Sequence, residues 1–318
     1  MSIKLDIKDK KLLALLEQNA RYSNSQLGKK IRLSKPAVEY RLQRLIDQKT
    51  IFNFYTLVNF NALGYSAYKL YFKLQDATLE DETAIVNYWL RQDNVVWVAS
   101  LRGRWDVAVT ILASSNNQFG QILSRFMNSY AHFILEKDVF LVEYSPMYLD
   151  KQDFAKKEYV YGVPTTPIQL DHIDHKILKE LSKNSRMHIV DLAVKTKLSR
   201  DIITYRIKKM LKEKTIIAFK IFPDYVTIGK NFYKLIIRTK NIDERLEKAL
   251  KEYSSIHRSS PQFIKLIGSF DIEIELITDT EDELYRILAD IRKKFSSIIR
   301  EYDIIRIIKT YKYDFYPF

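Results

Sequence analysis

The sequence predicts an α+β fold in which one plan, a three-helix unit followed by a unit of mixed strands and helices, occurs twice. One observation behind this prediction is an internal repeat: residues 33–51 (LSKPAVEYRLQRLIDQKTI) return 165 positions later as residues 198–216 (LSRDIITYRIKKMLKEKTI). The other is a change in hydrophobic period, from helix-like to strand-like, after Gly64 and again after Gly229.

The repeat keeps one register far beyond that stretch. The same offset pairs Asp6 with Asp171, Asp9 with Asp174, Arg21 with Arg186, Gly103 with Gly268 and Asp106 with Asp271. Chance matches would not hold one register over such a length without a gap, so the sequence indicates an internal duplication. Its functional sites are therefore expected in pairs.

The composition indicates a soluble protein with an ordinary core and a polyanionic partner. Of the 318 residues, 47% are hydrophobic and 29% are charged, and the net charge is +13. No cysteine is present, which excludes disulfides and thiolate metal sites. The N-terminal segment MSIKLDIKDKK has no apolar signal core, and no apolar run approaches the ~18 residues of a membrane helix, so we expect a cytoplasmic protein. Neither GxxxxGKS/T nor GxGxxG occurs, and no cofactor is expected.

Residues 1–50 have the pattern of a helix-turn-helix domain. A first helix over 8–19 places its leucines on one face, and a second helix covers about 24–31. Ser34 can cap a third helix through its hydroxyl, and Pro36 falls in the first turn, where its missing N–H costs nothing. Three short helices with a tight turn before a basic third one are typical of helix-turn-helix domains.

The third helix of each copy is the candidate DNA-binding element, although a solvated basic face is the ordinary alternative for an amphipathic helix. In the first copy Val38, Leu42 and Leu45 form one apolar stripe, and polar residues cover the rest. The residues predicted nearest to base edges are Lys35, Tyr40 and Gln43, with Arg200, Thr204, Tyr205 and Lys208. The predicted phosphate contacts are Ser34, Arg41, Arg44, Ser199, Arg206 and Lys209. For Arg41 and Arg206, an ion pair with a local acid is an equal alternative.

The segment after Gly64 predicts a βαββαβ unit, which is the ferredoxin-like arrangement. Residues 51–60 are rich in β-formers and predict a wing or connecting strand before it. Strands are expected over 65–74, 94–102, 106–113 and 136–145, with helices over 79–91 and 116–130. Gly103 lies between the two middle strands, where it can supply the positive φ of a tight turn.

The second half repeats this plan after a linker at 149–169, which combines charges with one Gly and two Pro. Helices are expected near 173–184, 188–196 and 199–212, and a second βαββαβ unit over about 231–313, which leaves the tail DFYPF without an obvious fold of its own. The predicted domains are two helix-turn-helix domains (1–50 and 170–215), two connectors (51–64 and 216–229) and two ferredoxin-like domains (65–148 and 230–318).

Four motifs in this order, occurring twice, resemble the Lrp/AsnC (feast/famine) family of transcription regulators. They are Asp-x-x-Asp before the first helix, LSxxxxxxR in the third, a connector that ends in Gly, and a Gly-x-x-Asp turn between the middle strands. The resemblance covers nearly the whole chain except the linker and the tail. It implies winged helix-turn-helix domains that bind double-stranded DNA, each joined to a ferredoxin-like effector and oligomerisation domain that pairs with another copy.

The resemblance further implies a sequence-specific transcription regulator, built here as a pseudo-dimer within one chain. In some members of the family the second domain binds an amino acid or a similar small molecule, so an amino-acid-like effector is a partner that the resemblance implies. Association of pseudo-dimers into a larger homo-oligomer stays open, as does the choice between activation and repression.

Two departures from the family pattern bear on DNA binding. Lys49 and Lys214 stand where members usually place Gly between the third helix and the wing, which puts the turn there in question. The third helices also differ, because residues 34–50 carry four basic and two acidic groups whereas residues 199–215 carry six and two. Because the two third helices differ, we predict an asymmetric operator, or one helix that contacts bases while the other mainly contacts phosphates.

The Gly-x-x-Asp turns are the candidate effector site, because in the family this turn lies near the effector pocket. The residues concerned are Arg102, Gly103, Arg104 and Asp106 in the first copy, with Gly268 and Asp271 in the second. Ordinary hairpin-turn chemistry is the alternative. Only the first copy has arginines beside the turn, so it is the better candidate for a carboxylate ligand.

Two other functions compete with DNA-binding regulation. Siroheme decarboxylases use the same pair of domains in fused chains, and they carry a His-Asn-Tyr motif in the second strand of the effector-like domain. The matching strands here read NVVWVASLRGRWD and PQFIKLIGSFD, without such a histidine. A small-molecule sensor or assembly protein that has lost DNA binding is the third candidate. No catalytic residue and no metal ligand is assigned, because the five histidines have no cysteine partners.

Overall fold

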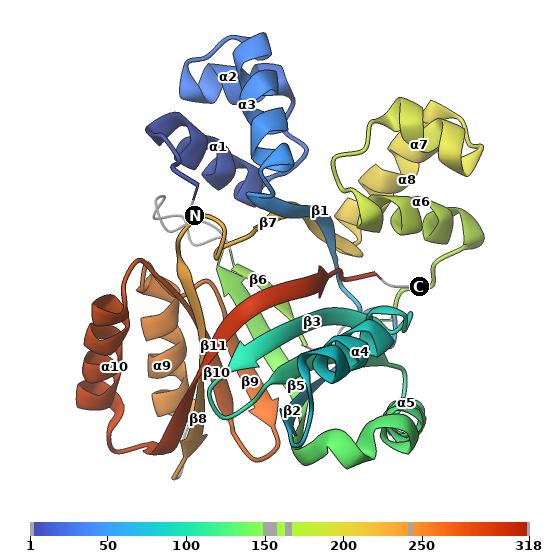
Figure 1. Cartoon of the computed structure of the whole chain (residues 1–318). Helices are drawn as coiled ribbons and strands as arrows, with labels where there is room; N and C mark the ends of the chain where they lie inside the picture. The colour runs from blue at the N-terminus through green and yellow to red at the C-terminus, as the bar shows by residue number, and fades with distance from the viewer. Residues whose placement is uncertain (1–2, 149–157, 163–166, 241–243, 317–318) are drawn as a thin grey trace. The chain divides into compact units, whose positions relative to one another are not determined.

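The computed structural model describes residues 3–148, 158–162, 167–240 and 244–316. The chain divides into two compact units, and each unit is assembled from both halves of the duplication (Figure 1). Unit 1 comprises residues 1–64, 165–229 and 313–318, whereas unit 2 comprises residues 65–164 and 230–312. The two copies of each kind of domain therefore lie in the same unit.

Unit 1 contains two three-helix bundles of the same design. Their helices are α1 (Ile7–Gln18), α2 (Asn24–Ile31) and α3 (Lys35–Asp47) in the first copy, and α6 (His172–Lys183), α7 (Ile189–Thr196) and α8 (Arg200–Lys212) in the second. Asp6, Ser23 and Ser34 cap the first three helices, because each side chain accepts a backbone N–H of the first turn. One apolar core includes leucine and isoleucine side chains from both bundles. The prediction of two helix-turn-helix domains is confirmed.

The wings of the two copies pair with each other. Strand β1 (Ile51–Val58) runs antiparallel to β7 (Ile216–Pro223) in a two-stranded sheet. Just beyond the strands, the Asn59 amide donates to the Thr215 carbonyl at 2.9 Å. The duplication thus produces one shared wing sheet, which links the two helix-turn-helix domains.

The C-terminal tail, for which the sequence indicates no fold of its own, packs into unit 1. Phe315 stacks on Tyr55 of β1 with ring centroids 5.5 Å apart. Tyr316 is 2% exposed and lies in the shared apolar core. Its hydroxyl is within hydrogen-bond distance of Nδ1 of His175 in α6. The tail therefore contributes to the core that both bundles share.

The strands of unit 2 form one closed sheet to which both halves contribute. Its order is β2 (Ser66–Leu74), β4 (Val107–Ala113), β3 (Val95–Arg102), β11 (Ile299–Tyr313), β8 (Asn231–Thr239), β10 (Ile272–Thr278), β9 (Phe263–Ile267) and β5 (Ile134–Tyr148), and β5 pairs again with β2. The halves meet at two seams, β5 with β9 and β3 with β11. Two ferredoxin-like domains with sheets of their own are therefore not confirmed, because the strands close into a single eight-stranded barrel.

A further strand, β6 (Glu158–Tyr161), lies within the segment predicted to be a linker. It pairs antiparallel with the end of β5, where Ser145 lies opposite Tyr161. Residues 149–157 and 163–166 of the predicted linker lie outside the described residues.

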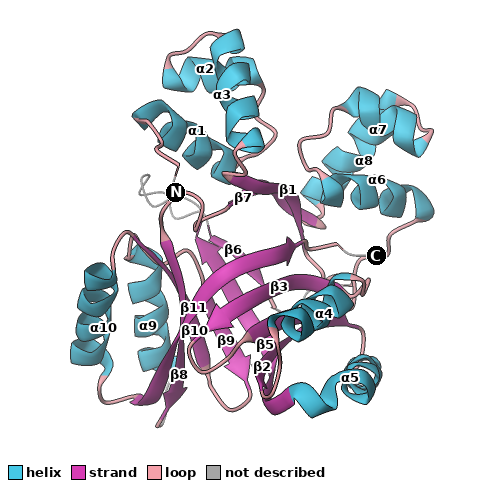
Figure 2. Cartoon of the chain, viewed as in Figure 1, coloured by secondary structure: helices cyan, strands magenta, loops and turns pink. Residues whose placement is uncertain are grey.

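Four long helices cover the outer face of the barrel (Figure 2). They are α4 (Leu79–Leu90) and α5 (Asn116–Tyr130), which the short 3-10 helix Ala131–Phe133 follows, and α9 (Glu244–Ile256) and α10 (Glu281–Phe295). Trp89 and Phe126 pack in the core of the first half, and Leu250 and Ile287 in the core of the second. Because one face of each strand meets these helices, the alternate residues fill the barrel interior.

Candidate nucleic-acid interface

The third helix of each bundle turns one face into the core and the other outward. In α3 the buried residues are Val38, Leu42 and Leu45, and in α8 they are Ile203, Ile207 and Met210. The Ser34 hydroxyl accepts from the Ala37 amide at 3.3 Å, and the Ser199 hydroxyl accepts from the Ile202 amide at 3.2 Å. These caps fix where each helix begins, and therefore which side chains the outward face carries.

The outward face presents most of the side chains predicted to meet base edges. Tyr40 is 69% exposed and Tyr205, at the same place in the second copy, is 64% exposed. The other exposed members of the set are Lys35, Gln43, Arg200 and Lys208. Thr204 differs, because it is half-buried and its hydroxyl donates to the Arg200 carbonyl at 2.8 Å within the helix.

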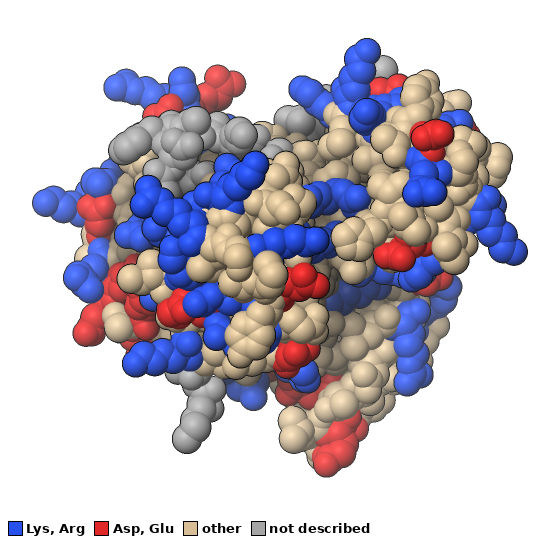
Figure 3. All heavy atoms as spheres, turned by 90° about the horizontal axis from the view of Figure 1, so that it is seen from above, with Lys and Arg blue, Asp and Glu red and all other residues tan. Residues whose placement is uncertain are grey.

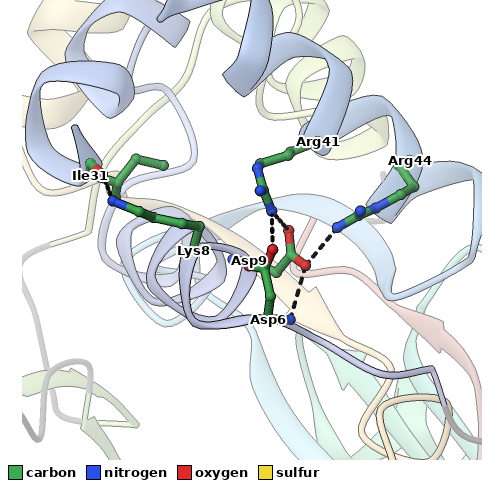
Figure 4. Close-up of polar contacts among 6 residues, drawn as sticks. All are labelled: Asp6, Lys8, Asp9, Ile31, Arg41 and Arg44. Carbon is green, nitrogen blue, oxygen red and sulfur yellow. Dashed lines mark hydrogen bonds and ion pairs between the residues drawn. The ribbon is translucent and has the colours of Figure 1, made fainter. Parts of the chain in front are cut away.

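Two carboxylates at the start of α1 bind two of the predicted phosphate ligands, Arg41 and Arg44 of α3 (Figure 4). Arg41 Nη1 lies 2.6 Å from Asp6 Oδ2 and 2.8 Å from Asp9 Oδ1, and Arg44 Nη2 lies 2.6 Å from Asp9 Oδ2. Asp9 is only 1% exposed, so its charge is neutralised inside the bundle. The hydrogen bond from Arg41 lowers the pKa of Asp6 to about 2. The local-acid alternative for Arg41 is thus the contact that the structure shows.

The second copy repeats this arrangement with one arginine. Arg206 Nη1 lies 2.6 Å from Asp171 and 3.3 Å from Asp174. The backbone N–H of Asp174, together with Arg206, lowers the pKa of Asp171. At the position of Arg44 the second copy has Lys209, which has no described carboxylate within ion-pair distance. Of the predicted phosphate ligands, Arg41, Arg44 and Arg206 bind carboxylates, whereas Lys209 has no carboxylate partner among the described residues.

The turn after each third helix has a lysine in a left-handed backbone conformation. Lys49 and Lys214 adopt φ values of 56° and 57°, in the left-handed region. Both are exposed, and the Thr50 amide still donates to the Leu45 carbonyl at 2.9 Å. The left-handed conformation at this turn is thus adopted by lysine, at a conformational cost that glycine would not have.

A reciprocal brace between the two bundles was not assigned a role from the sequence. Arg21 Nη1 donates to the carbonyl oxygens of Ser185 at 2.7 Å and Met187 at 3.1 Å. Arg186, its partner in the repeat, donates to the Tyr22 carbonyl at 2.6 Å and also to the Asn24 side chain. Burial lowers the pKa of both guanidinium groups. The sequence offered one signal for this contact, because arginine occurs at both equivalent positions of the repeat, 21 and 186.

Positive side chains are distributed over the molecular face drawn in Figure 3 and are interspersed with acidic ones. No single basic patch dominates this view, although the net charge of the chain is +13.

The predicted effector residues lie in two hairpin turns of unit 2, β3–β4 and β9–β10, whose aspartates bind the ends of the neighbouring strands β2 and β8. Asp106 accepts from the Leu74 amide at 2.8 Å, and Asp271 accepts from the Thr239 amide at 2.6 Å. A Cβ on Gly103, which has a φ of 126°, would lie 2.9 Å from the Ile304 carbonyl oxygen. These contacts give both turns a structural role, and ligand binding there stays a prediction.

The glycine of the second turn is required for close packing instead of for a positive φ. A Cβ on Gly268 would lie 2.6 Å from the Phe140 ring and 2.9 Å from the Val139 carbonyl oxygen. Each turn thus packs against the last strand of the other half.

The arginines beside the first turn differ in their availability. Arg104 lies 3.0 Å from Asp303 and 3.0 Å from Glu136, so two carboxylates already bind it. Arg102 is exposed and donates to the carbonyl oxygen of its neighbour Leu101 at 2.9 Å. Arg102 is therefore the better placed of the two to meet a carboxylate ligand.

Neither a membrane span nor a metal centre is found in the part of the chain that the structure describes. No described helix is both long and apolar enough to cross a membrane. No group of three described His, Asp or Glu side chains is arranged to hold a metal ion.

Known proteins match the chain in both bundles. Residues 5–46 match the AsnC-type helix-turn-helix domain, and residues 170–217 match a winged helix-turn-helix DNA-binding domain. The HTH-type transcriptional regulator Rv2324 of Mycobacterium tuberculosis is 31% identical over 128 residues, which are 40% of this chain and 84% of that protein. The chain belongs to the AsnC family of HTH-type transcription regulators. The proline dehydrogenase transcriptional activator of Rhizobium radiobacter is 26% identical over 41% of this chain and 81% of its own length.

A solved structure also matches almost the whole chain of this AsnC-family member. The crystal structure of the siroheme decarboxylase NirDL superposes with a TM-score of 0.61 over 96% of this chain and 93% of that one, at 9% identity. At this identity the match establishes a common fold, including the fused pair of halves, and nothing about activity.

Proposed function

We propose that this AsnC-family chain is a sequence-specific DNA-binding transcription regulator in which two helix-turn-helix domains of one polypeptide act as a fused pair. The observation that carries this proposal is the matched pair of outward tyrosines, Tyr40 and Tyr205, on helices whose opposite faces are buried. Exposed aromatic and basic side chains on a capped third helix suit the major groove.

The contacts divide into three groups by their surroundings in the structure. Base edges would be met by Lys35, Tyr40 and Gln43 in the first copy and by Arg200, Thr204, Tyr205 and Lys208 in the second. Phosphates would be met by Ser34, Ser199 and Lys209. Arg41, Arg44 and Arg206 would act mainly by orienting their helices through the carboxylates that they bind.

The two copies would read unlike half-sites. Glu39 and Gln43 of α3 are replaced by Thr204 and Lys208 in α8, so the second copy offers a more basic surface. A carboxylate favours a base-edge donor, whereas a lysine favours acceptors or phosphate. The proposed operator is therefore asymmetric.

In unit 2 we propose that each half derives from a ferredoxin-like unit whose sheet edges meet those of the other half. The strand order β5-β2-β4-β3 in the first half and β11-β8-β10-β9 in the second supports this assignment.

An amino-acid-like effector would bind near the first turn, with Arg102 as the carboxylate ligand. Isothermal titration with single amino acids tests this part, and equal heats for Arg102→Ala and the native chain would count against it.

Siroheme decarboxylation is the second candidate, because of the fold shared with NirDL. The strands β3 and β9 contain no histidine, and the outward faces of α3 and α8 carry exposed basic residues suited to DNA. Absorbance titration with an iron porphyrin separates the two candidates. A saturable shift of the porphyrin band, without any retention of DNA, would favour the enzyme.

The decisive experiment is retention of genomic fragments, including the gene's own promoter, at two salt concentrations. We expect selective retention that weakens steeply with salt, because phosphate contacts release counterions. Single substitutions Tyr40→Ala and Tyr205→Ala should each reduce selectivity more than they change the salt dependence. Absence of retention at low salt, with and without amino acids, would overturn the proposal.

A further inference from the structure

The interior of the barrel in unit 2 holds a cluster of buried charges. Lys69 of β2, Lys234 of β8 and Glu273 of β10 are 3%, 2% and 0% exposed, and no other Lys, Arg, Asp or Glu residue is buried in the described part of unit 2. Glu275 of β10 lies beside them, with 14% of its side chain exposed. Such groups are rarely buried unless they are paired.

Glu273 joins the two halves of the barrel. One of its oxygens accepts from the Lys69 ammonium group and from the Tyr71 hydroxyl, the latter at 2.8 Å. The other oxygen lies 2.5 Å from Nζ of Lys234, which also reaches Glu275 at 2.7 Å. Lys69 thus obtains its buried counter-ion from the other half of the duplication.

The duplication does not divide these charges equally. Lys69 and Lys234 are equivalent positions, but Glu273 and Glu275 correspond to Ala108 and Thr110 in the first half. The first half therefore contributes one positive charge, and the second contributes one positive and two negative charges. Only a barrel built from unlike halves has a neutral interior.

The pKa values of the clustered side chains also show that each half depends on charges from the other. Burial lowers the pKa of Lys69 to about 8, against the attraction of Glu273. Lys234 is equally buried, but its two carboxylates raise its pKa above the usual value. Burial alone would raise the pKa of Glu273, and the two lysines instead lower it to about 2. Without the acids of the second half, two ammonium groups would share an apolar interior, which is strongly unfavourable.

We propose that this cluster is a pairing code that selects a barrel made of one first half and one second half and rejects pairing with the like half of a second copy of this chain. Two first halves would bury two lysines without a carboxylate. Two second halves would bury four carboxylates against two lysines. The inference concerns assembly and is independent of DNA binding.

The test redistributes the four charges without changing their number. In a symmetric variant, Ala108→Glu with Glu275→Thr, each half carries one lysine and one glutamate, so like halves can also form a neutral interior. In a relocated variant, Ala108→Glu, Thr110→Glu, Glu273→Ala and Glu275→Thr, both acids lie in the first half. In the relocated variant, as in the native chain, only unlike halves form a neutral interior, so this variant is the matched control.

Disulfide reporters can be introduced because the chain has no cysteine. Val142 of β5 lies opposite Leu266 of β9 at the seam between the halves, so Val142→Cys with Leu266→Cys reports closure of the native barrel. The first-half equivalent of Leu266 is Leu101. Leu101→Cys with Val142→Cys therefore forms a disulfide between chains only when two first halves pair.

Each full-length chain is unfolded, refolded under oxidising conditions and analysed for covalent dimers. With the Leu101/Val142 reporter we expect at least about tenfold more dimer from the symmetric variant than from the native or relocated chain, since only the symmetric chain loses the charge penalty. Equal dimer yields from all three would overturn the proposal, as would abundant dimer from the native chain.

A second variant keeps the test decisive if the symmetric chain does not close. Lys69→Met, Lys234→Met, Glu273→Gln and Glu275→Gln together remove every charge of the cluster. When the Val142/Leu266 reporter shows that this neutral barrel closes, its Leu101/Val142 form should also yield dimers between chains. Closure without such dimers would show that other contacts determine the pairing and would overturn the proposal.

Discussion

At the level of single residues, Asp9 determines how the first recognition helix is held. This carboxylate is 1% exposed, and each of its oxygens accepts from a different arginine of α3. Because both arginines remain partly exposed, the ion pairs place the helix without fully burying a positive charge. The sequence revealed the Asp-x-x-Asp motif, but its spacing could not decide whether Arg41 meets DNA or this acid.

Asp9→Asn should destabilise the first bundle and weaken DNA binding through the position of α3. Loss of two charge-assisted hydrogen bonds predicts a decrease of about 2 kcal/mol in the free energy of unfolding. Chemical denaturation and an operator-binding titration measure the two effects. The matched change Asp174→Asn should cost less, because Arg206 reaches Asp174 only at 3.3 Å and is 2.6 Å from Asp171. Equal losses at the two positions would contradict this account.

Lys49→Gly should stabilise the first bundle, because a left-handed φ of 56° is strained for lysine and accessible to glycine. We expect a gain of about 1 kcal/mol in the free energy of unfolding. Lys49→Ala is the control, since alanine has the same strain and removes the same charge. A similar gain from both substitutions would show that charge, and not the backbone, limits stability at this turn.

At the level of elements, period and capping predict helices and strands well, because both depend on residues close in sequence. The pairing of strand edges depends on the other half of the chain, so neither the shared wing sheet nor the closed barrel followed from hydrophobic period. One signal was available in residues 65–74, where the alternation leaves Lys69 beside apolar and aromatic neighbours. A lysine on the inner face of a strand indicates a buried counter-ion elsewhere in the chain.

The outward side chains of the two recognition helices, α3 and α8, should determine whether the operator is symmetric. Arg200→Lys, Thr204→Glu and Lys208→Gln together give α8 the outward side chains of α3 at these positions. Selection from a random duplex library should then change from an asymmetric to a two-fold symmetric motif. None of these side chains lies in the buried core, so the free energy of unfolding should change by less than about 0.5 kcal/mol, which circular dichroism during denaturation checks. An unchanged motif would show that α8 does not read bases.

At the level of the whole molecule, reciprocal contacts between the two copies occur in both units. In unit 1 the wings pair, and Arg21 and Arg186 each bind the loop of the opposite bundle. In unit 2 each turn glycine packs against the last strand of the other half. Repeat symmetry could be read from the sequence, whereas contacts between repeats could not, because identical residues are equally compatible with contacts inside each copy.

The arginine brace should determine how tightly the pair of helix-turn-helix domains binds an operator with two half-sites. In Arg21→Ala with Arg186→Ala, each bundle keeps its core, but the bundles lose the bonds that fix their relative orientation. Affinity for the full operator should fall about tenfold or more, because the second contact loses effective concentration. Affinity for an isolated half-site should stay the same, and so should the salt dependence, because these half-buried arginines bind backbone carbonyl oxygens instead of phosphate. The double lysine variant should lose less than the double alanine variant, since one ammonium group can donate to two carbonyl oxygens, as each Nη1 does, but cannot also reach Asn24 as Nη2 of Arg186 does. An equal loss on isolated half-sites would instead show that the arginines support each bundle separately, and unchanged binding to the full operator would show that the wing sheet alone fixes the pair.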